Sequence, residues 1–126
     1  MTSPDIGEQI LHLDVRTTHG LFKVASASAT EYFLQIYPEA GLAIGRLLRR
    51  PGVGSSRMGG DNEWVPLLSV QRAEESADDI TWTDGVVTVG HRHMYWLAPR
   101  HRSDAGWWIQ RRATAIARLH RVPPLA

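Results

Sequence analysis

Alternation of apolar and polar residues with a period of two is the feature that most limits what this chain can fold into. Leu11, Leu13, Val15 and Thr17 alternate with more polar neighbours. Successive side chains of a β-strand point to opposite faces, so the pattern favours a strand with one buried face. Comparable short runs follow, separated by glycine, proline and serine. We therefore predict a mainly β fold, a small antiparallel barrel or sandwich of six to eight strands.

The other predicted strands lie in segments rich in β-branched and aromatic residues. They are Leu21–Ala25, Glu31–Tyr37, Ala43–Arg50, Glu63–Arg72, Ile80–Val89 as a hairpin, and Met94–Ala98. The glycine- and serine-rich segment 51–62 is predicted to be a mobile loop, residues 1–10 to be flexible and residues 121–126 to form a tail. One domain is therefore expected to span residues 1–126.

The hairpin at residues 80–89 is the clearest local pattern, because Asp84 and Gly85 form a two-residue turn between β-rich arms. This turn would pair Trp82 with Val87 and Ile80 with Val89. The resulting apolar face would be buried, and the opposite, threonine-rich face would be exposed.

The final segment, residues 107–122, allows two interpretations. Ile109, Ala113 and Ile116 recur at helical spacing, which would give one carboxy-terminal helix and an α+β fold. No polar face accompanies them, and a β-dominated protein commonly closes with a strand. We predict a strand, with the helix as the alternative.

Composition excludes several classes of protein. The 126 residues are 43% hydrophobic, enough for one modest core, and include no cysteine, so disulfides, thiolate metal sites and thiol nucleophiles are excluded. The amino terminus does not have the pattern of a secretory signal, and no apolar run is long enough to span a bilayer. We expect a cytoplasmic protein without membrane contact.

Charge is distributed unevenly along the chain. Residues 1–85 carry seven basic and twelve acidic groups, for a net charge of −5, whereas residues 86–126 carry seven arginines and Asp104, for +6. Such asymmetry is typical of proteins that meet nucleic acid or an acidic partner. Alternatively, the two parts neutralise each other within the fold, and we favour this second explanation.

Several landmarks along the chain are shared with a group of known proteins. They are Thr17, Thr18 and Gly20; Arg49–Gly52; Asp61–Val70 (DNEWVPLLSV); Val89, Gly90 and Met94; and Arg112, Thr114, Ile116 and Arg118. With these the chain resembles short actinobacterial and actinophage proteins of unassigned function. The resemblance implies an all-β unit that ends in a strand, with no catalytic residues to carry over. Those proteins often have a proline after a threonine in the last segment, where this chain has Ala115.

The carboxy-terminal half concentrates the residues that most often bind macromolecules. Guanidinium groups pair with carboxylates or phosphates, and aromatic rings provide interface area or stack on bases. The predicted binding residues are Arg92, Tyr95, Trp96, Arg100, Arg102, Trp107, Trp108, Arg111 and Arg112.

Three other sequence features are candidate signs of catalysis, and none indicates it strongly. His91 and His93 form an H-x-H pair, whose spacing on a strand could place both imidazoles on one zinc or nickel ion, and His101 could be a third ligand. The acids Glu74, Glu75, Asp78 and Asp79 fit a solvated loop better than an acid–base pair. Neither a nucleophile elbow nor a phosphate-binding loop is present.

We therefore expect a non-enzymatic protein-interaction module without a cofactor, which binds an acidic protein and is encoded by a phage or prophage. Nucleic-acid binding by the same residues is the alternative, and a metal-dependent enzyme using the H-x-H pair is the third hypothesis. Formation of a homo-oligomer is compatible with each of them.

Overall fold

A computed structural model describes residues 6–37, 43–58, 60–98 and 106–123 of the protein. These residues form a curled antiparallel sheet and a small two-stranded ribbon. The strands are β1 (Ile6–Ile10), β2 (His12–Asp14), β3 (Gly20–Ser26), β4 (Glu31–Ile36), β5 (Gly45–Arg50), β6 (Trp64–Glu75), β7 (Ile80–Asp84), β8 (Val86–Thr88), β9 (His93–Leu97), β10 (Trp107–Gln110) and β11 (Ala113–Leu119). Among these described residues no helix is long and apolar enough to cross a membrane.

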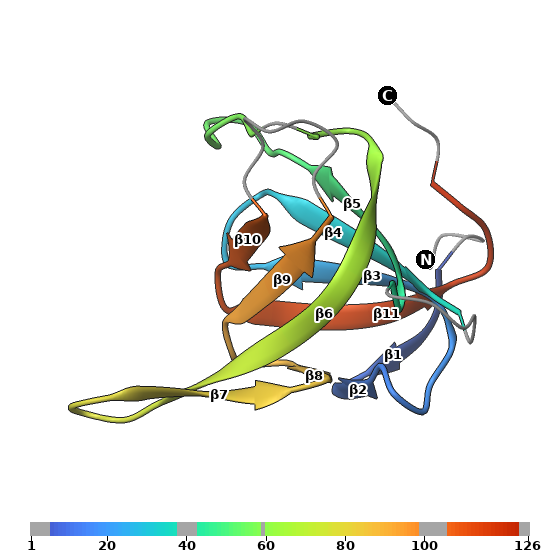
Figure 1. The fold of residues 1–126 in the computed structure, drawn as a ribbon. Coiled ribbons are helices and arrows are strands. Elements are labelled where there is room, and N and C mark those ends of the chain that lie inside the picture. Colours follow the sequence, from blue (N-terminus) through green and yellow to red (C-terminus); the bar gives the residue numbers. More distant parts are fainter. Residues whose placement is uncertain (1–5, 38–42, 59, 99–105, 124–126) are drawn as a thin grey trace.

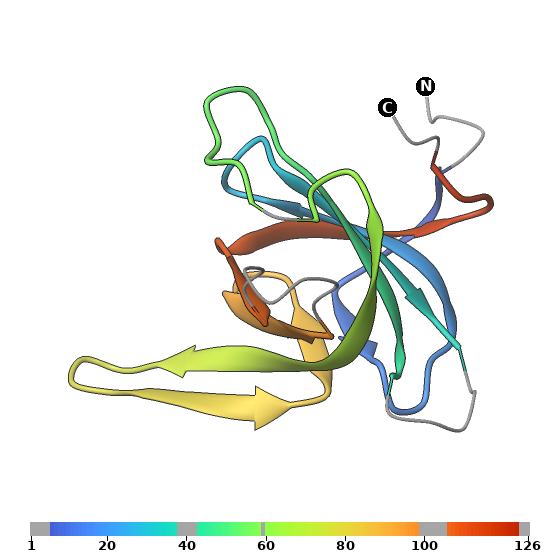
Figure 2. The ribbon, with the colours of Figure 1, turned by 45° about the horizontal axis from the view of Figure 1, so that its top comes forward.

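Nine strands form the large sheet in the order β1-β11-β3-β4-β5-β6-β9-β10, with β7 paired to β6 beside this path. Its neighbouring strands are antiparallel. Only Arg111 and Arg112 join β10, at one end of the ladder, to β11 near the other end. The sheet therefore curls back on itself, as Figures 1 and 2 show, but β1 and β10 do not pair and the ladder is not closed.

The core lies inside this curl and is extended by the two-stranded ribbon of β2 and β8. Leu13 and Val87 of the ribbon are 1% and 0% exposed and belong to the same apolar cluster as Phe22, Leu34 and Leu47 of the large sheet. Removal of these side chains from water is the main stabilising contribution to such a fold. The ribbon thus packs on the large sheet as in a small sandwich.

The mainly β class and the carboxy-terminal strand are confirmed, and the alternative of a terminal helix is wrong. In β10, Trp108 and Gln110 are buried while Trp107 and Ile109 are exposed, which is the period of a strand. The strands number eleven in the described part of the chain, more than the six to eight predicted.

The structure of the amino-terminal part of the chain differs from two predictions. Residues 6–10 were expected to be flexible, but they form β1 and pair with β11, where Ile10 lies opposite Ile116. Residues 1–5 and 124–126 lie outside the described residues. The predicted strand at residues 11–18 is also shorter than expected, because the chain turns after Asp14, whose backbone carbonyl accepts hydrogen bonds from the N–H groups of Thr17 and Thr18.

The predicted hairpin at Asp84 and Gly85 is wrong in its pairing. β7 pairs with β6, so that Trp82 lies opposite Ala73, and the hairpin turn is at residues 76–79. Gly85 still redirects the chain, with φ of +79°, but it leads into β8, which pairs with β2. Pairing with β2 places Val87 in the core, an apolar environment that the exposed strand β7 cannot provide.

The β6–β7 hairpin projects from the body as an arm, shown in yellow-green and yellow in Figures 1 and 2. Four of the five residues of β7 are exposed, among them Ile80 at 44% and Trp82 at 37%. Glu75 and Asp79 lie at or near its turn. The arm therefore presents both apolar and acidic groups to solvent.

Candidate binding surfaces

The predicted binding residues do not form one surface. Tyr95 and Trp108 are 0% and 1% exposed and belong to the core cluster, so their prediction as surface residues is wrong. Both side chains alternate with exposed neighbours in β9 and β10 and therefore point to the inner face. Arg100 and Arg102 lie outside the described residues.

The predicted arginines are partly neutralised by an acid from the first part of the chain. Glu75 accepts a hydrogen bond from Arg92 Nε at 2.7 Å, and its other oxygen lies 3.6 Å from Arg112 Nη2. Compensation within the fold therefore accounts for two of the predicted binding arginines. No described residue forms an ion pair, a hydrogen bond or an aromatic contact with Arg111, whose side chain is exposed.

Trp96 and Trp107 form the centre of an exposed aromatic surface. They lie directly opposite each other in the β9–β10 ladder, with 37% and 44% of each residue exposed. Side chains of directly opposed residues share one face of a sheet, and Met94 and Ile109 form the next pair on this face. We call Trp96, Trp107, Met94 and Ile109, together with Trp82, the tryptophan face.

Trp82 belongs to this face through the register of β6. Gln71 lies opposite both Met94 and Asp84, and Trp82 is two residues before Asp84, so it points to the same side of the ladder. Gln71 also orders the face, because its Oε1 accepts a hydrogen bond from Trp96 Nε1 at 2.8 Å and its Nε2 donates to Asp84 Oδ1 at 2.7 Å. One ring of the face is thus held in place before any partner binds.

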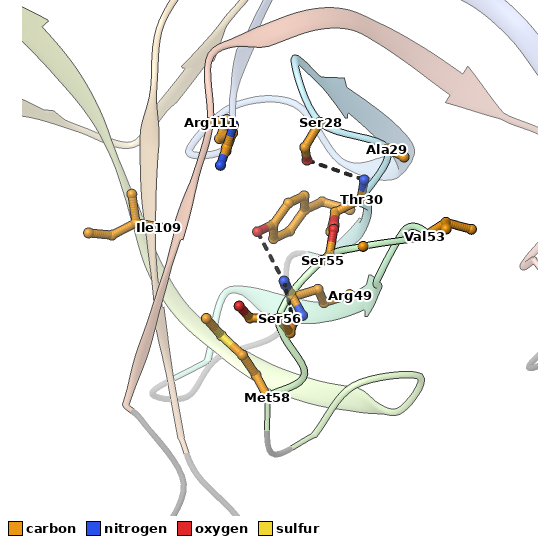
Figure 3. Close-up of a pocket in the computed structure, with 12 residues that line it drawn as sticks. Ser28, Ala29, Thr30, Arg49, Val53, Ser55, Ser56, Met58, Ile109 and Arg111 are labelled. Atoms are coloured by element: carbon orange, nitrogen blue, oxygen red, sulfur yellow. Dashed lines mark hydrogen bonds between the residues drawn. The ribbon is translucent and has the colours of Figure 1, made fainter.

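A cavity of about 450 Å³, which shares Ile109 with the tryptophan face, lies where three segments of the chain meet. It is lined by residues 28–30 of the β3–β4 turn, residues 53–56 and 58 after β5, Ile109 and Arg111 at the end of β10, and Tyr32 and Arg49. Figure 3 shows Arg111 and Ile109 on one side of this cavity and Val53 on the other. We call it the corner pocket.

Arg49 is the most unusual residue of the corner pocket, because its charged side chain is only 7% exposed. Its Nη1 donates to Asp61 Oδ1 at 2.7 Å, its Nη2 to the carbonyl of Ser56 at 3.3 Å and its Nε to Tyr32 Oη at 3.4 Å. Burial alone lowers the pKa of Arg49, but the hydrogen bonds with Asp61 and Tyr32 outweigh it and raise the pKa above its ordinary value. Arg49 and Asp61 thus form a buried ion pair without net charge.

Hydroxyl groups line another part of the pocket. Thr30 Oγ1 accepts a hydrogen bond from the N–H of Gly52 at 3.2 Å and lies 2.6 Å from Ser55 Oγ. These bonds join the β3–β4 turn to the segment after β5. The described residues of the predicted loop, 51–58 and 60–62, are irregular, as expected, and Thr30 and Arg49 attach them to the rest of the fold.

His91 and His93 have different environments. His93 is fully buried, its Nε2 accepts a hydrogen bond from the N–H of Thr88 at 3.0 Å, and its Nδ1 lies 3.2 Å from Gln110 Oε1. His91 is partly exposed, and its Nδ1 bonds to the carbonyl of Ala73 at 2.9 Å. His101 lies outside the described residues, and within those that are described no three His, Asp or Glu side chains form a metal-binding group.

The burial of His93 predicts a loss of stability in acid. Burial lowers the pKa of His93 to about 4, so the unfolded chain binds a proton there more readily than the folded protein. The contribution of His93 to stability is therefore complete above about pH 6.5 and decreases as the pH falls from there towards 4, by about 3 kcal/mol in total. Urea unfolding at several pH values measures this dependence. A His93→Gln variant should show a flatter profile over the same range, and equal slopes would contradict the prediction.

Sequence reasoning did not identify Tyr32, Arg49 and Asp61 as parts of one site. Asp61 lies in the irregular segment and Tyr32 and Arg49 lie in strands, so no local spacing connects them. The β4–β5 register, which places Tyr32 opposite Arg49, brings the two side chains to one face. The strand Gly45–Arg50 contains three arginines, Arg46, Arg49 and Arg50, so its sequence alone does not single out Arg49.

No family model matches the chain, and comparisons with curated proteins and with solved structures likewise give no match. The resemblance to actinobacterial and actinophage proteins therefore stays a prediction.

Proposed function

We propose that this protein is a non-enzymatic protein-interaction module and that its partner docks on the tryptophan face. The observation that supports this most directly is the opposed pair Trp96 and Trp107, both substantially exposed on neighbouring strands. Tryptophan is the residue type most enriched among those that dominate interface energies, and adjoining exposed apolar side chains commonly mark interaction sites.

The partner that fits this face has an apolar surface with an acidic group at its border. Arg111 follows Ile109 by two positions, and no described residue neutralises its charge. A carboxylate of the partner placed opposite Arg111 would provide the missing counter-charge. The bond from Trp96 to Gln71 reduces the entropy that this ring loses when it is covered.

Nucleic-acid binding is supported less well by the same surface. Arg92 and Arg112, which would neutralise phosphates, are already within ion-pair distance of Glu75. Retention of a random oligonucleotide that falls steeply with added salt would favour nucleic acid over a protein partner.

Replacing Trp107 by alanine should weaken the partner complex roughly thirtyfold, the effect of losing a central interface residue, while stability changes by less than about 1 kcal/mol. The partner is first captured from an actinobacterial lysate, identified by mass spectrometry and purified, and its dissociation constant is then measured by calorimetry. Leu11→Ala is the matched control, because Leu11 is 75% exposed and lies outside the tryptophan face. Equal effects of the two substitutions would contradict the proposal.

A further inference from the structure

A hydrogen-bond donor of the corner pocket, the phenol of Tyr32, lacks an acceptor among the described residues. Arginine has donors only, so the oxygen of Tyr32 accepts the bond from Arg49 Nε and the phenol hydrogen needs a different acceptor. No described residue accepts this hydrogen. Tyr32 is 3% exposed and lines the pocket, so a group bound in the pocket can supply the acceptor.

The phenol of Tyr32 stays protonated at neutral pH and therefore remains a hydrogen-bond donor. Burial raises the pKa of its phenol above the ordinary value, although Arg49 acts in the opposite direction. Its ring is also fixed by stacking on Tyr95, with 5.2 Å between the ring centroids. The donor is therefore present at neutral pH and has a defined position.

Ser55, which also lines the pocket, adds a second hydroxyl group. Thr30 Oγ1 accepts a bond from the N–H of Gly52 and lies 2.6 Å from Ser55 Oγ, and either hydroxyl can supply the hydrogen between the two oxygens. When Thr30 supplies it, the hydroxyl hydrogen of Ser55 is available to a ligand. Tyr32, and Ser55 in this orientation, are complemented by an acceptor.

The charge of the residues that line the pocket indicates the sign of the ligand's charge. Asp61 neutralises Arg49, whereas Arg111 contributes a positive charge for which the described residues provide no counter-ion. Val53, Met58 and Ile109 add apolar surface at the rim, and all three are exposed. The cavity volume of about 450 Å³ is in the range of small-molecule sites.

We infer that the corner pocket binds an oxyanion group, a carboxylate or a phosphate, carried by an organic molecule whose apolar part contacts the rim. Arg111 supplies the charge, and the hydroxyls of Tyr32 and Ser55 donate to the oxygens. The group belongs either to a free small molecule or to an acidic side chain of a protein. Ile109 and Arg111 border both the tryptophan face and the pocket. The inference still does not rest on the proposed function, because Tyr32 and Ser55 lie outside the tryptophan face and binding is measured without a partner.

The test is a titration followed by the amide resonances of Thr30 and Ser55 in two-dimensional NMR spectra. The probes are benzoate, phenyl phosphate and inorganic phosphate, with benzamide as the neutral analogue of benzoate. We expect saturable shifts with the three anions, tighter binding of the two organic anions than of inorganic phosphate, and at least roughly tenfold weaker binding of benzamide, since hydrogen bonds to charged groups are the stronger ones. Absence of saturable shifts with all anions would overturn the inference.

Substitutions locate the site within the pocket. Arg111→Gln and Tyr32→Phe should each weaken benzoate binding roughly tenfold, and Ser55→Ala provides a third test if the Tyr32 variant does not fold. Arg57→Gln is the matched control, because it removes the same charge from the segment between Ser56 and Met58 at an exposed residue that does not line the pocket. Equal weakening by Arg57→Gln and Arg111→Gln would mean a diffuse charge effect and would overturn the site.

The source of the oxyanion is resolved by one more titration. A capped Ala-Glu-Ala peptide carries the carboxylate as a partner protein would. Tighter binding of benzoate or phenyl phosphate than of this peptide assigns a free organic anion, and the reverse order assigns an acidic side chain. Loss of partner binding in Trp107→Ala with intact benzoate binding would show that the tryptophan face and the pocket act separately.

Discussion

Trp108→Ala should destabilise the protein by about 3–5 kcal/mol, the range found when a buried aromatic side chain is truncated to alanine. Trp108 is 1% exposed and packs in the central apolar cluster, so its removal leaves a cavity that the surrounding strands cannot fill. Unfolding in urea, monitored by circular dichroism, gives the difference in free energy from the wild type.

Trp107→Ala is the control for this prediction, because it removes the same side chain from the adjacent position. Trp107 is 44% exposed, and its loss should change the unfolding free energy by less than about 1 kcal/mol. Similar losses for both variants would contradict the assignment of these two residues to opposite faces of β10.

Arg49→Met should cost about 3–5 kcal/mol, because it leaves the carboxylate of Asp61 buried without its counter-ion. Both side chains are 7% exposed, and the 2.7 Å bond from Arg49 is the one ion pair of Asp61 in the described part of the chain. Thermal and urea unfolding of the purified variant measure the loss.

The double variant Arg49→Met with Asp61→Asn separates the ion pair from the packing of Arg49. The N–H of Met58 donates to Asp61 Oδ2 at 2.8 Å, and the amide oxygen introduced by Asp61→Asn can still accept this bond but carries no charge. We expect the double variant to be more stable than Arg49→Met alone, with a coupling energy on the order of 1–3 kcal/mol. Additive losses from the two single changes would show that the pair is not coupled.

Some of the fold followed from short-range patterns. The strands β3, β4, β5 and β9 lie within one or two residues of the predicted segments Leu21–Ala25, Glu31–Tyr37, Ala43–Arg50 and Met94–Ala98. Each of these segments contains apolar or aromatic residues and is followed in the sequence by a serine or a proline, and such a pattern indicates the local backbone directly. The terminal segment was harder, because β10 has apolar residues on both faces and a buried Gln110, which obscures the alternation.

The partners of the strands could not be predicted in the same way. Asp84 and Gly85 do turn the chain, but which strand Val86 and Val87 join depends on a core residue 74 positions away, since Val87 lies opposite Leu13. Similarly, the composition did not distinguish Arg92, which is paired with Glu75, from Arg111, which is not. Such choices depend on contacts between distant parts of the chain.

The amino-acid sequence by itself determined that this protein is a cysteine-free, mainly β protein, because side-chain alternation and turn residues act over a few positions. The tertiary structure alone decided which tryptophans face solvent and that Tyr32, Arg49, Ser55 and Arg111 meet around one pocket. The physical reason is that burial and charge neutralisation are properties of the register between strands, and a shift of one residue moves every side chain to the other face.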